Sequence, residues 1–178
     1  MKVLDESGED VSMTVADGLI ENEEAVVLLA DWKTQIQHAW YDASHDENGV
    51  WVPNQYNQNF LDMIWEMSLT AFNFPREVQV VIDSKDDLYM SFGTGGYVDF
   101  PSVMQGGMKL PIKCWIHTHP FGQAYFSGTD WKTIKTWQSK MQSAIVLGNN
   151  QHMVWKKENT HTVFYRRDDN LTWSGEEE

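Results

Sequence analysis

Two stretches of the chain repeat apolar residues at the spacing of an amphipathic helix. In residues 22–43 they recur every three or four positions, after an asparagine that can cap a helix and two glutamates in its first turn. Residues 57–72 carry a second apolar stripe, which Pro75 ends. A third helix is predicted over residues 129–140, where "SGTD" supplies a start signal. The pattern therefore predicts three helices.

Short apolar runs bounded by turn residues predict strands at 50–53, 77–84, 88–92, 96–100, 110–119, 143–148, 152–158 and 162–168. Glycine-rich turns between residues 88 and 110 indicate a surface loop. This order of elements predicts an α+β fold, or a layered α/β fold, with a mixed β-sheet flanked by helices. We expect an acidic tail plus an amphipathic helix in residues 1–47, one domain in 48–170 and an acidic C-terminal tail in 171–178.

Composition narrows the classes of function. The net charge is -13, from 26 acidic and 13 basic residues, so most of the surface would repel a phosphate backbone. A single cysteine, Cys114, excludes an internal disulfide framework and fits a reducing compartment. The sequence has no apolar run near 18 residues and no secretory-type N-terminus. We therefore expect a cytoplasmic protein without nucleic-acid or membrane partners.

The stretch "KCWIHTHPFGQAYFSGTDW" concentrates side chains that can bind a metal. Residues i and i+2 of a strand point to the same face, so His117 and His119 are expected side by side. Trp115 shares their face, whereas Cys114 points away as a core residue. Two neutral imidazoles can bind one Zn2+, and the carboxylate of Asp130 at the next helix start can close the site. Three protein ligands leave one position for water, as in catalytic zinc sites.

Ser127 has two interpretations. The segment "SGTD" fits a capping box, in which the serine hydroxyl caps the helix start. The same turn could hold that hydroxyl beside a metal, where it would donate to the oxyanion of a tetrahedral intermediate. Paired histidines on a strand are often structural, so the metal hypothesis depends on the histidines, the proline, Ser127 and Asp130 occurring together.

The stretch "WIHTHPFGQAYFSGTD" resembles the motif of the JAMM zinc metalloproteases (MPN+, Mov34/JAB), in which H-[S/T]-H-P is followed by six residues and then S-x-x-D. The residues of this stretch are most similar to the motif of the AMSH-like deubiquitinases. The resemblance covers roughly residues 48–168 and implies a cytidine-deaminase-like core, with the N-terminal helix outside. It implies that His117, His119 and Asp130 bind one catalytic zinc ion, that Glu77 takes a proton from the attacking water and that Ser127 stabilises the oxyanion.

Glu77 has the least support from the residues alone. The family places its glutamate at the start of the strand after the first core helix, where Glu77 stands in "PREVQVVI". A glutamate entering an apolar strand is either exposed at the strand end or functional. Glu66 is the rival, but it lies within a predicted helix, where a solvated face explains it. The acids of "DSKDD" fit a turn.

The resemblance implies a metallopeptidase or isopeptidase acting on a protein or peptide, at the C-terminal tail of a ubiquitin-like or sulfur-carrier-like protein. Two alternatives stay open: a non-catalytic MPN-type binding or assembly module, and a phage-type peptidase acting on a tail or cell-wall component. The loop from 84 to 110 is short and rich in glycine, so specificity for ubiquitin is not implied. His152 and His161 flank the last strands and are expected at the surface or sheet edge. The oligomeric state stays open.

Overall fold

A computed structural model describes residues 14–15, 23–47, 49–52, 59–71, 75–93, 107–158, 162–168 and 173–177; at 14–15, 23–29 and 176–177 it describes the backbone alone. The expected strand at 96–100, most of the glycine-rich loop and His161 lie outside these ranges. The three expected helices are present within them. None of the helices in the described ranges is long and apolar enough to cross a membrane.

The described elements follow the predicted order with two differences. They are β1 (Thr14–Val15), α1 (Glu23–Asp42), α2 (Asn59–Thr70), β2 (Val78–Ile82), β3 (Leu88–Phe92), β4 (Cys114–Thr118), α3 (Gly128–Trp137), a 3-10 turn (Gln138–Lys140), β5 (Ser143–Gly148), β6 (Gln151–Lys156), β7 (Val163–Arg167) and β8 (Trp173–Glu177). Strands β1 and β8 were not predicted, and the described part of the segment expected as a strand at 50–53 forms only an isolated bridge between Trp51 and His45.

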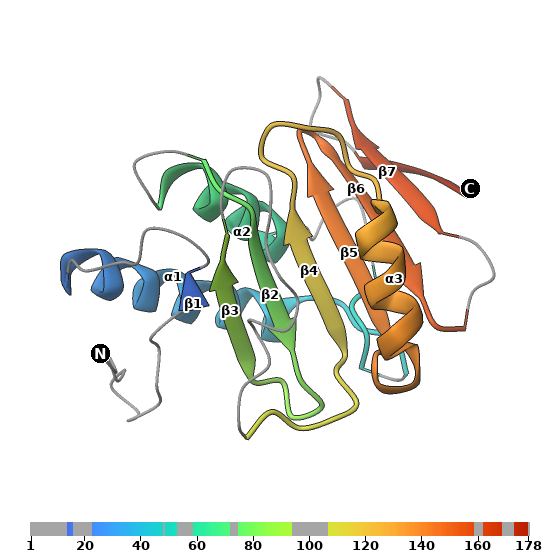
Figure 1. Cartoon of the computed structure of the whole chain (residues 1–178), viewed down its shortest axis with the longest axis horizontal. Coiled ribbons are helices and arrows are strands. Elements are labelled where there is room, and N and C mark those ends of the chain that lie inside the picture. The colour runs from blue at the N-terminus through green and yellow to red at the C-terminus, as the bar shows by residue number, and fades with distance from the viewer. Residues whose placement is uncertain are drawn as a thin grey trace.

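The strands form one mixed sheet, so the fold is α+β, as expected. Their order is β1-β3-β2-β4-β5-β6-β7-β8. The β4–β5 and β1–β3 pairs are parallel and the other neighbours are antiparallel. Parallel neighbours need a crossover connection, and α3 lies in the connection between β4 and β5 (Figure 1). This crossover begins at the end of β4 where the predicted histidines lie.

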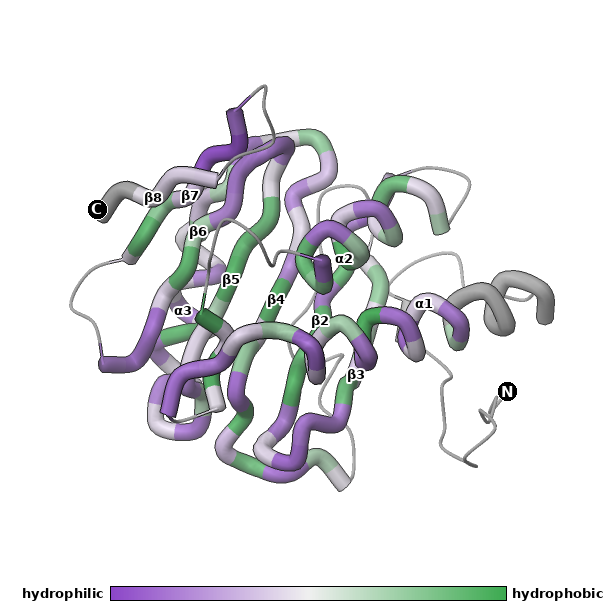
Figure 2. The backbone as a smooth tube through the Cα atoms, turned by 180° about the vertical axis from the view of Figure 1, so that it is seen from behind, coloured by the Kyte–Doolittle hydropathy of each residue, from purple (hydrophilic) through white to green (hydrophobic). Residues whose placement is uncertain are grey.

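The sheet buries an apolar core on each face. One core joins α1 and α2 to alternate residues of the strands, and the other joins α3 to the residues between them. The helices accordingly lie on opposite faces (Figure 1). Every residue of β2, β4 and β5 is buried, as expected for central strands covered on both faces. Figure 2 shows hydrophobic residues concentrated along β4 and β5.

The N-terminal helix belongs to this core. Ile36 and Trp40 of α1 are at most 1% exposed and pack in the same cluster as α2. Nε1 of Trp40 donates to Oδ1 of Asp86 at 2.9 Å, and Nζ of Lys113 pairs with the same oxygen at 2.6 Å. The turn between β2 and β3 thus anchors α1. The described part of the predicted apolar stripe, around Ile36 and Trp40, therefore packs within the chain.

The C-terminal region differs from expectation. Residues Trp173–Glu177, within the segment expected to be an acidic tail, form strand β8 beside β7. The expectation for His152 is wrong, because its side chain is fully buried. Tyr165 stacks on it at 4.7 Å, and Trp173 of β8 meets it edge-on at 4.4 Å. Strand β8, whose sequence is acidic and contains a glycine, thus helps to bury His152 through Trp173.

Candidate metal centre

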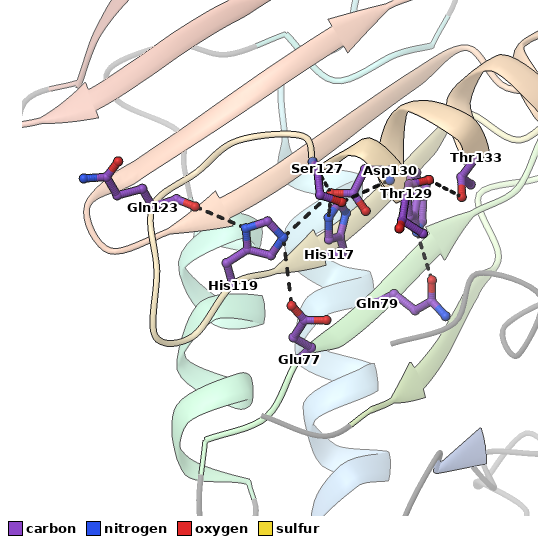
Figure 3. A network of polar contacts seen from close by, with 10 residues as sticks. Glu77, Gln79, His117, His119, Gln123, Ser127, Thr129, Asp130 and Thr133 are labelled. Atoms are coloured by element: carbon purple, nitrogen blue, oxygen red, sulfur yellow. Dashed lines mark hydrogen bonds and ion pairs between the residues drawn. The ribbon is translucent and has the colours of Figure 1, made fainter. Parts of the chain in front are cut away.

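Three side chains that can bind a metal converge at the end of β4 and the start of α3 (Figure 3). One ligand atom from each of His117, His119 and Asp130 lies within 4.8 Å of the others. Nε2 of His117 is 3.0 Å from Oδ2 of Asp130, and Nε2 of His119 is 3.7 Å from the same oxygen. The structure therefore brings together the three residues expected to be ligands.

Asp130 is positioned by the helix that it helps to begin. The Oγ of Ser127 accepts a hydrogen bond from the backbone nitrogen of Asp130 at 3.1 Å, and the backbone nitrogen of Ser127 donates to Oδ2 of Asp130 at 2.9 Å. This is the capping box predicted from "SGTD". Because its Oγ accepts here, the hydroxyl hydrogen of Ser127 can donate elsewhere.

His119 lies one residue past β4, and the loop that follows fixes its ring. Its Nδ1 is 3.1 Å from the carbonyl oxygen of Gln123. A proton on Nδ1 can donate to this carbonyl and leave Nε2 free to bind a metal. Two hydrogen bonds hold the loop on the end of the β5–β6 hairpin. The backbone nitrogen of His119 donates to the carbonyl oxygen of Leu147 at 2.8 Å. The backbone nitrogen of Ala124 donates to Oε1 of Gln151 at 3.2 Å.

A close approach of two backbones at Gly148 permits this loop position. A Cβ added to Gly148 would lie 2.4 Å from the nitrogen of Ala124 and 2.7 Å from the carbonyl carbon of Gln123. Only a residue without a side chain allows backbones to come so close. Gly148 therefore helps to bring the carbonyl of Gln123 to His119.

The register of β2 against β4 brings Glu77 to the cluster. Gln79 pairs with His117 in the antiparallel ladder, and the same alignment places Glu77, two residues before Gln79, opposite His119, two residues after His117. Oε1 of Glu77 is 3.9 Å from Nε2 of His119, and the side chain is 13% exposed. Glu66 is exposed on α2, as expected for a solvated helical face. The geometry thus favours Glu77 over its rival.

The aromatic wall predicted beside the histidines is present. The ring of Trp115 stacks on that of His117, with centroids 4.6 Å apart and planes at 16°. Nε1 of Trp115 donates to Oε1 of Gln79 at 2.9 Å, and Nε2 of Gln79 donates to Oγ of Ser91 at 2.7 Å. Gln79 was not predicted as part of the site, although a polar residue inside the apolar run "VQVVI" was a usable signal. Cys114 is buried in the core on the opposite face of the sheet, as expected, and burial raises the pKa of its thiol to about 12.

Burial and hydrogen bonds set the charge of the cluster. Burial lowers the pKa of His119 and the neighbouring His117 lowers it further, while the hydrogen bond with Gln123 opposes them. Burial acts to raise the pKa of Asp130, but the hydrogen bonds and charge of His117, together with the hydrogen bonds of Ser127, outweigh it and hold the pKa below its ordinary value. A neutral imidazole and an ionised carboxylate are the forms that bind metals.

The donor set fits a zinc ion. Zinc bonds to imidazole nitrogen and carboxylate oxygen are about 2.0–2.2 Å long, which places neighbouring atoms of a tetrahedral site about 3.3 Å apart. The distances of 3.0 Å and 3.7 Å from Oδ2 of Asp130 to the two imidazole nitrogens bracket that value. The His-His-Asp cluster can therefore hold a divalent metal ion.

Comparisons of the chain with protein-family models, with curated proteins and with solved structures find no match. Fold and site together define an α+β protein with a candidate His-His-Asp metal centre at the junction of a central strand and a crossover helix. Its function has to be argued from that site.

Proposed function

We propose that the chain is a zinc-dependent peptidase or isopeptidase of the JAMM (MPN+) type, with its site residues within 48–170 and α1 packed on the same core. The observation that carries the proposal is the convergence of His117, His119 and Asp130 on one point, with Glu77 and Ser127 beside them. The spacing of the motif in the sequence supports the same assignment. The crossover by α3 between parallel β4 and β5 agrees with the cytidine-deaminase-like core that the motif implies.

The chemistry is the addition of water across a carbon–nitrogen bond. A bound zinc ion would act as a Lewis acid and lower the pKa of a coordinated water to about 7. Glu77 accepts a proton from the attacking water and returns it to the leaving amine as the carbon–nitrogen bond breaks. The hydroxyl of Ser127 donates a hydrogen bond to the oxygen on which negative charge develops.

The proposed substrate is a protein or peptide, and the resemblance favours the C-terminal tail of a ubiquitin-like or sulfur-carrier-like protein. An open pocket of about 540 Å³, bordered by α2, the loop after His119 and the β5–β6 turn but by none of the three candidate ligands, supports a peptide substrate. It is lined by uncharged side chains, among them Trp65, Phe121, Gln123 and Gln151. Aromatic and amide groups suit the apolar side chains and backbone of a peptide.

Incubation of the zinc-loaded protein with a panel of ubiquitin-like and sulfur-carrier fusions, read by intact mass, tests the proposal. We expect cleavage at one fused bond. The Glu77→Gln protein should bind zinc as the parent does and cleave about 10²–10⁴-fold more slowly, because it lacks the proton acceptor.

Glu66→Gln is the matched control, since it makes the same chemical change at an exposed position of α2 and should cleave like the parent. A Glu77→Gln protein as active as the parent would contradict the role of Glu77. Tight binding of a fusion partner without cleavage by the zinc-loaded protein would instead support the MPN-type binding module.

A further inference from the structure

His117 lacks the hydrogen bond that usually fixes a metal-binding imidazole. A ligand histidine ordinarily uses its second ring nitrogen to donate to a carbonyl or carboxylate, which sets the orientation of the ring. His119 follows this rule through the carbonyl of Gln123. Nδ1 of His117 is buried and has no hydrogen-bond partner within the described part of the chain. Another contact has to orient this ring.

That contact is the stacking of His117 on Trp115. The two rings are nearly parallel, at 16°, and both residues are 2% exposed. A ring held flat against a neighbour in a closely packed interior cannot turn without losing that contact. The orientation of His117 therefore depends on where the indole of Trp115 lies.

A buried network of side-chain hydrogen bonds fixes the indole of Trp115. Nε1 of Trp115 donates to Oε1 of Gln79, whose Nε2 donates to Oγ of Ser91, and both Gln79 and Ser91 are 0% exposed. Ser91, Gln79 and His117 are also successive partners in the register of β3, β2 and β4. A buried network of satisfied side-chain hydrogen bonds rigidifies its surroundings. The amide of Gln79 joins the two hydrogen bonds of this network, one to Trp115 and one to Ser91.

We propose that Gln79 is a positioning residue of the metal centre, which fixes the indole of Trp115 and through it the orientation of His117 as a ligand. This inference rests on the proposed function and deepens it, because the motif assigns no role to this position. A purely structural Gln79 would only satisfy the indole N–H. Its replacement would then lower the stability of the protein without changing the affinity for metal.

Zinc affinity, measured by competition with a chromophoric chelator, separates the two roles. Gln79→Met keeps the length of the side chain and removes both hydrogen bonds. Val80→Ala is the matched control, because Val80 is the next residue of β2, is 0% exposed and belongs to the core on the opposite face. Both substitutions should lower the melting temperature. Only Gln79→Met should weaken zinc binding, by about 10–100-fold, and alter the visible absorption of the Co2+-loaded protein.

Ser91→Ala is a smaller change that keeps the test available if Gln79→Met does not fold. It removes the anchor of the Gln79 amide and leaves the acceptor of the indole in place. We expect it to weaken zinc binding in the same direction and by less than Gln79→Met.

A double-mutant cycle with Trp115→Phe tests the route through the indole. Phenylalanine keeps a ring against His117 but has no N–H, so Gln79 has nothing left to fix. Gln79→Met should therefore change zinc affinity much less in the Trp115→Phe background than in the parent. Equal effects in the two backgrounds, or a Gln79→Met protein that binds zinc as the parent does, would overturn the inference. A parent that binds no zinc would overturn the proposed function instead.

Discussion

Ser127 and Asp130 hold each other through two hydrogen bonds: the backbone nitrogen of Ser127 donates to Oδ2 of Asp130 at 2.9 Å, and the backbone nitrogen of Asp130 donates to Oγ of Ser127 at 3.1 Å. The pair caps the N-terminus of α3. The same Oδ2 lies 3.0 Å from Nε2 of His117. The capping interaction therefore also positions a candidate metal ligand, as expected of a site built on rigid elements.

Substitutions of Ser127 should separate its capping role from its catalytic role. Ser127→Ala removes a helix cap and should cost about 1 kcal/mol of unfolding free energy, whereas Ser127→Gly should cost only a few tenths. Both remove the hydroxyl that donates to the oxyanion, so both should lower kcat by about 10²–10³-fold. Urea unfolding and the cleavage rate of a susceptible fusion measure the two effects. Activity that follows stability, with the glycine protein near normal, would show that the hydroxyl acts only as a cap.

Gly148→Ala should weaken zinc binding from outside the cluster. The new Cβ would clash with the backbone of Ala124 and Gln123, so the loop has to move and the carbonyl of Gln123 leaves His119. We expect a loss of about 1–3 kcal/mol of stability and a lower affinity for zinc in the chelator assay.

Gly128→Ala is the control, because Gly128 lies at the start of α3 and the added Cβ would meet no atom within 4 Å beyond its chain neighbours and its own helix backbone. It should bind zinc as the parent does. Unchanged affinity in Gly148→Ala would mean that the loop does not support His119.

His152 should make the protein less stable in acid. Burial and, as a smaller cause, the charge of Arg167 together lower the pKa of His152 from an ordinary 6.5 to about 3. Below pH 6.5 the unfolded chain takes up a proton that the folded chain does not, so the unfolding free energy falls as the pH falls from 6.5 toward 3. The contribution of this one group is about 1.4 kcal/mol per pH unit within that window, and it vanishes above it.

Replacement of His152 by phenylalanine isolates this contribution. The new side chain stays uncharged among Trp51, Tyr165 and Trp173, so urea unfolding at pH 7 and pH 5 should show a smaller loss of stability than the parent shows. His38→Gln is the control, since His38 is exposed on α1 and its replacement should keep the pH dependence of the parent. Identical slopes for the parent and the His152→Phe protein would contradict the burial argument.

Local rules were enough to predict most of the candidate site. Strand parity placed His117 and His119 near each other with Trp115 beside them, and capping chemistry placed Ser127 and Asp130 at the start of α3. Such features depend on residues close in the sequence. His119 lies just beyond β4, yet the hydrogen bond from its backbone nitrogen to Leu147 continues the alignment with β5.

Contacts between distant segments explain what the sequence did not reveal. Trp173 supplies part of the cover that buries His152, and it lies in a segment whose acidic residues and glycine gave no strand signal. Gln79 matters because β2 pairs with β3 on one side and β4 on the other, which brings Ser91 and Trp115 to its amide. Periodicity along one strand carries no information about which strands become its neighbours.

The central claim is that His117, His119 and Asp130 bind one zinc ion. Metal analysis of the purified chain after incubation with zinc and removal of free metal tests it most directly. We expect one zinc ion per chain in the parent and in Cys114→Ala, which removes the only thiol, and almost none in His119→Ala or Asp130→Ala. A parent without zinc, or zinc content that survives both ligand substitutions, would show that these residues are not the ligands of a zinc ion.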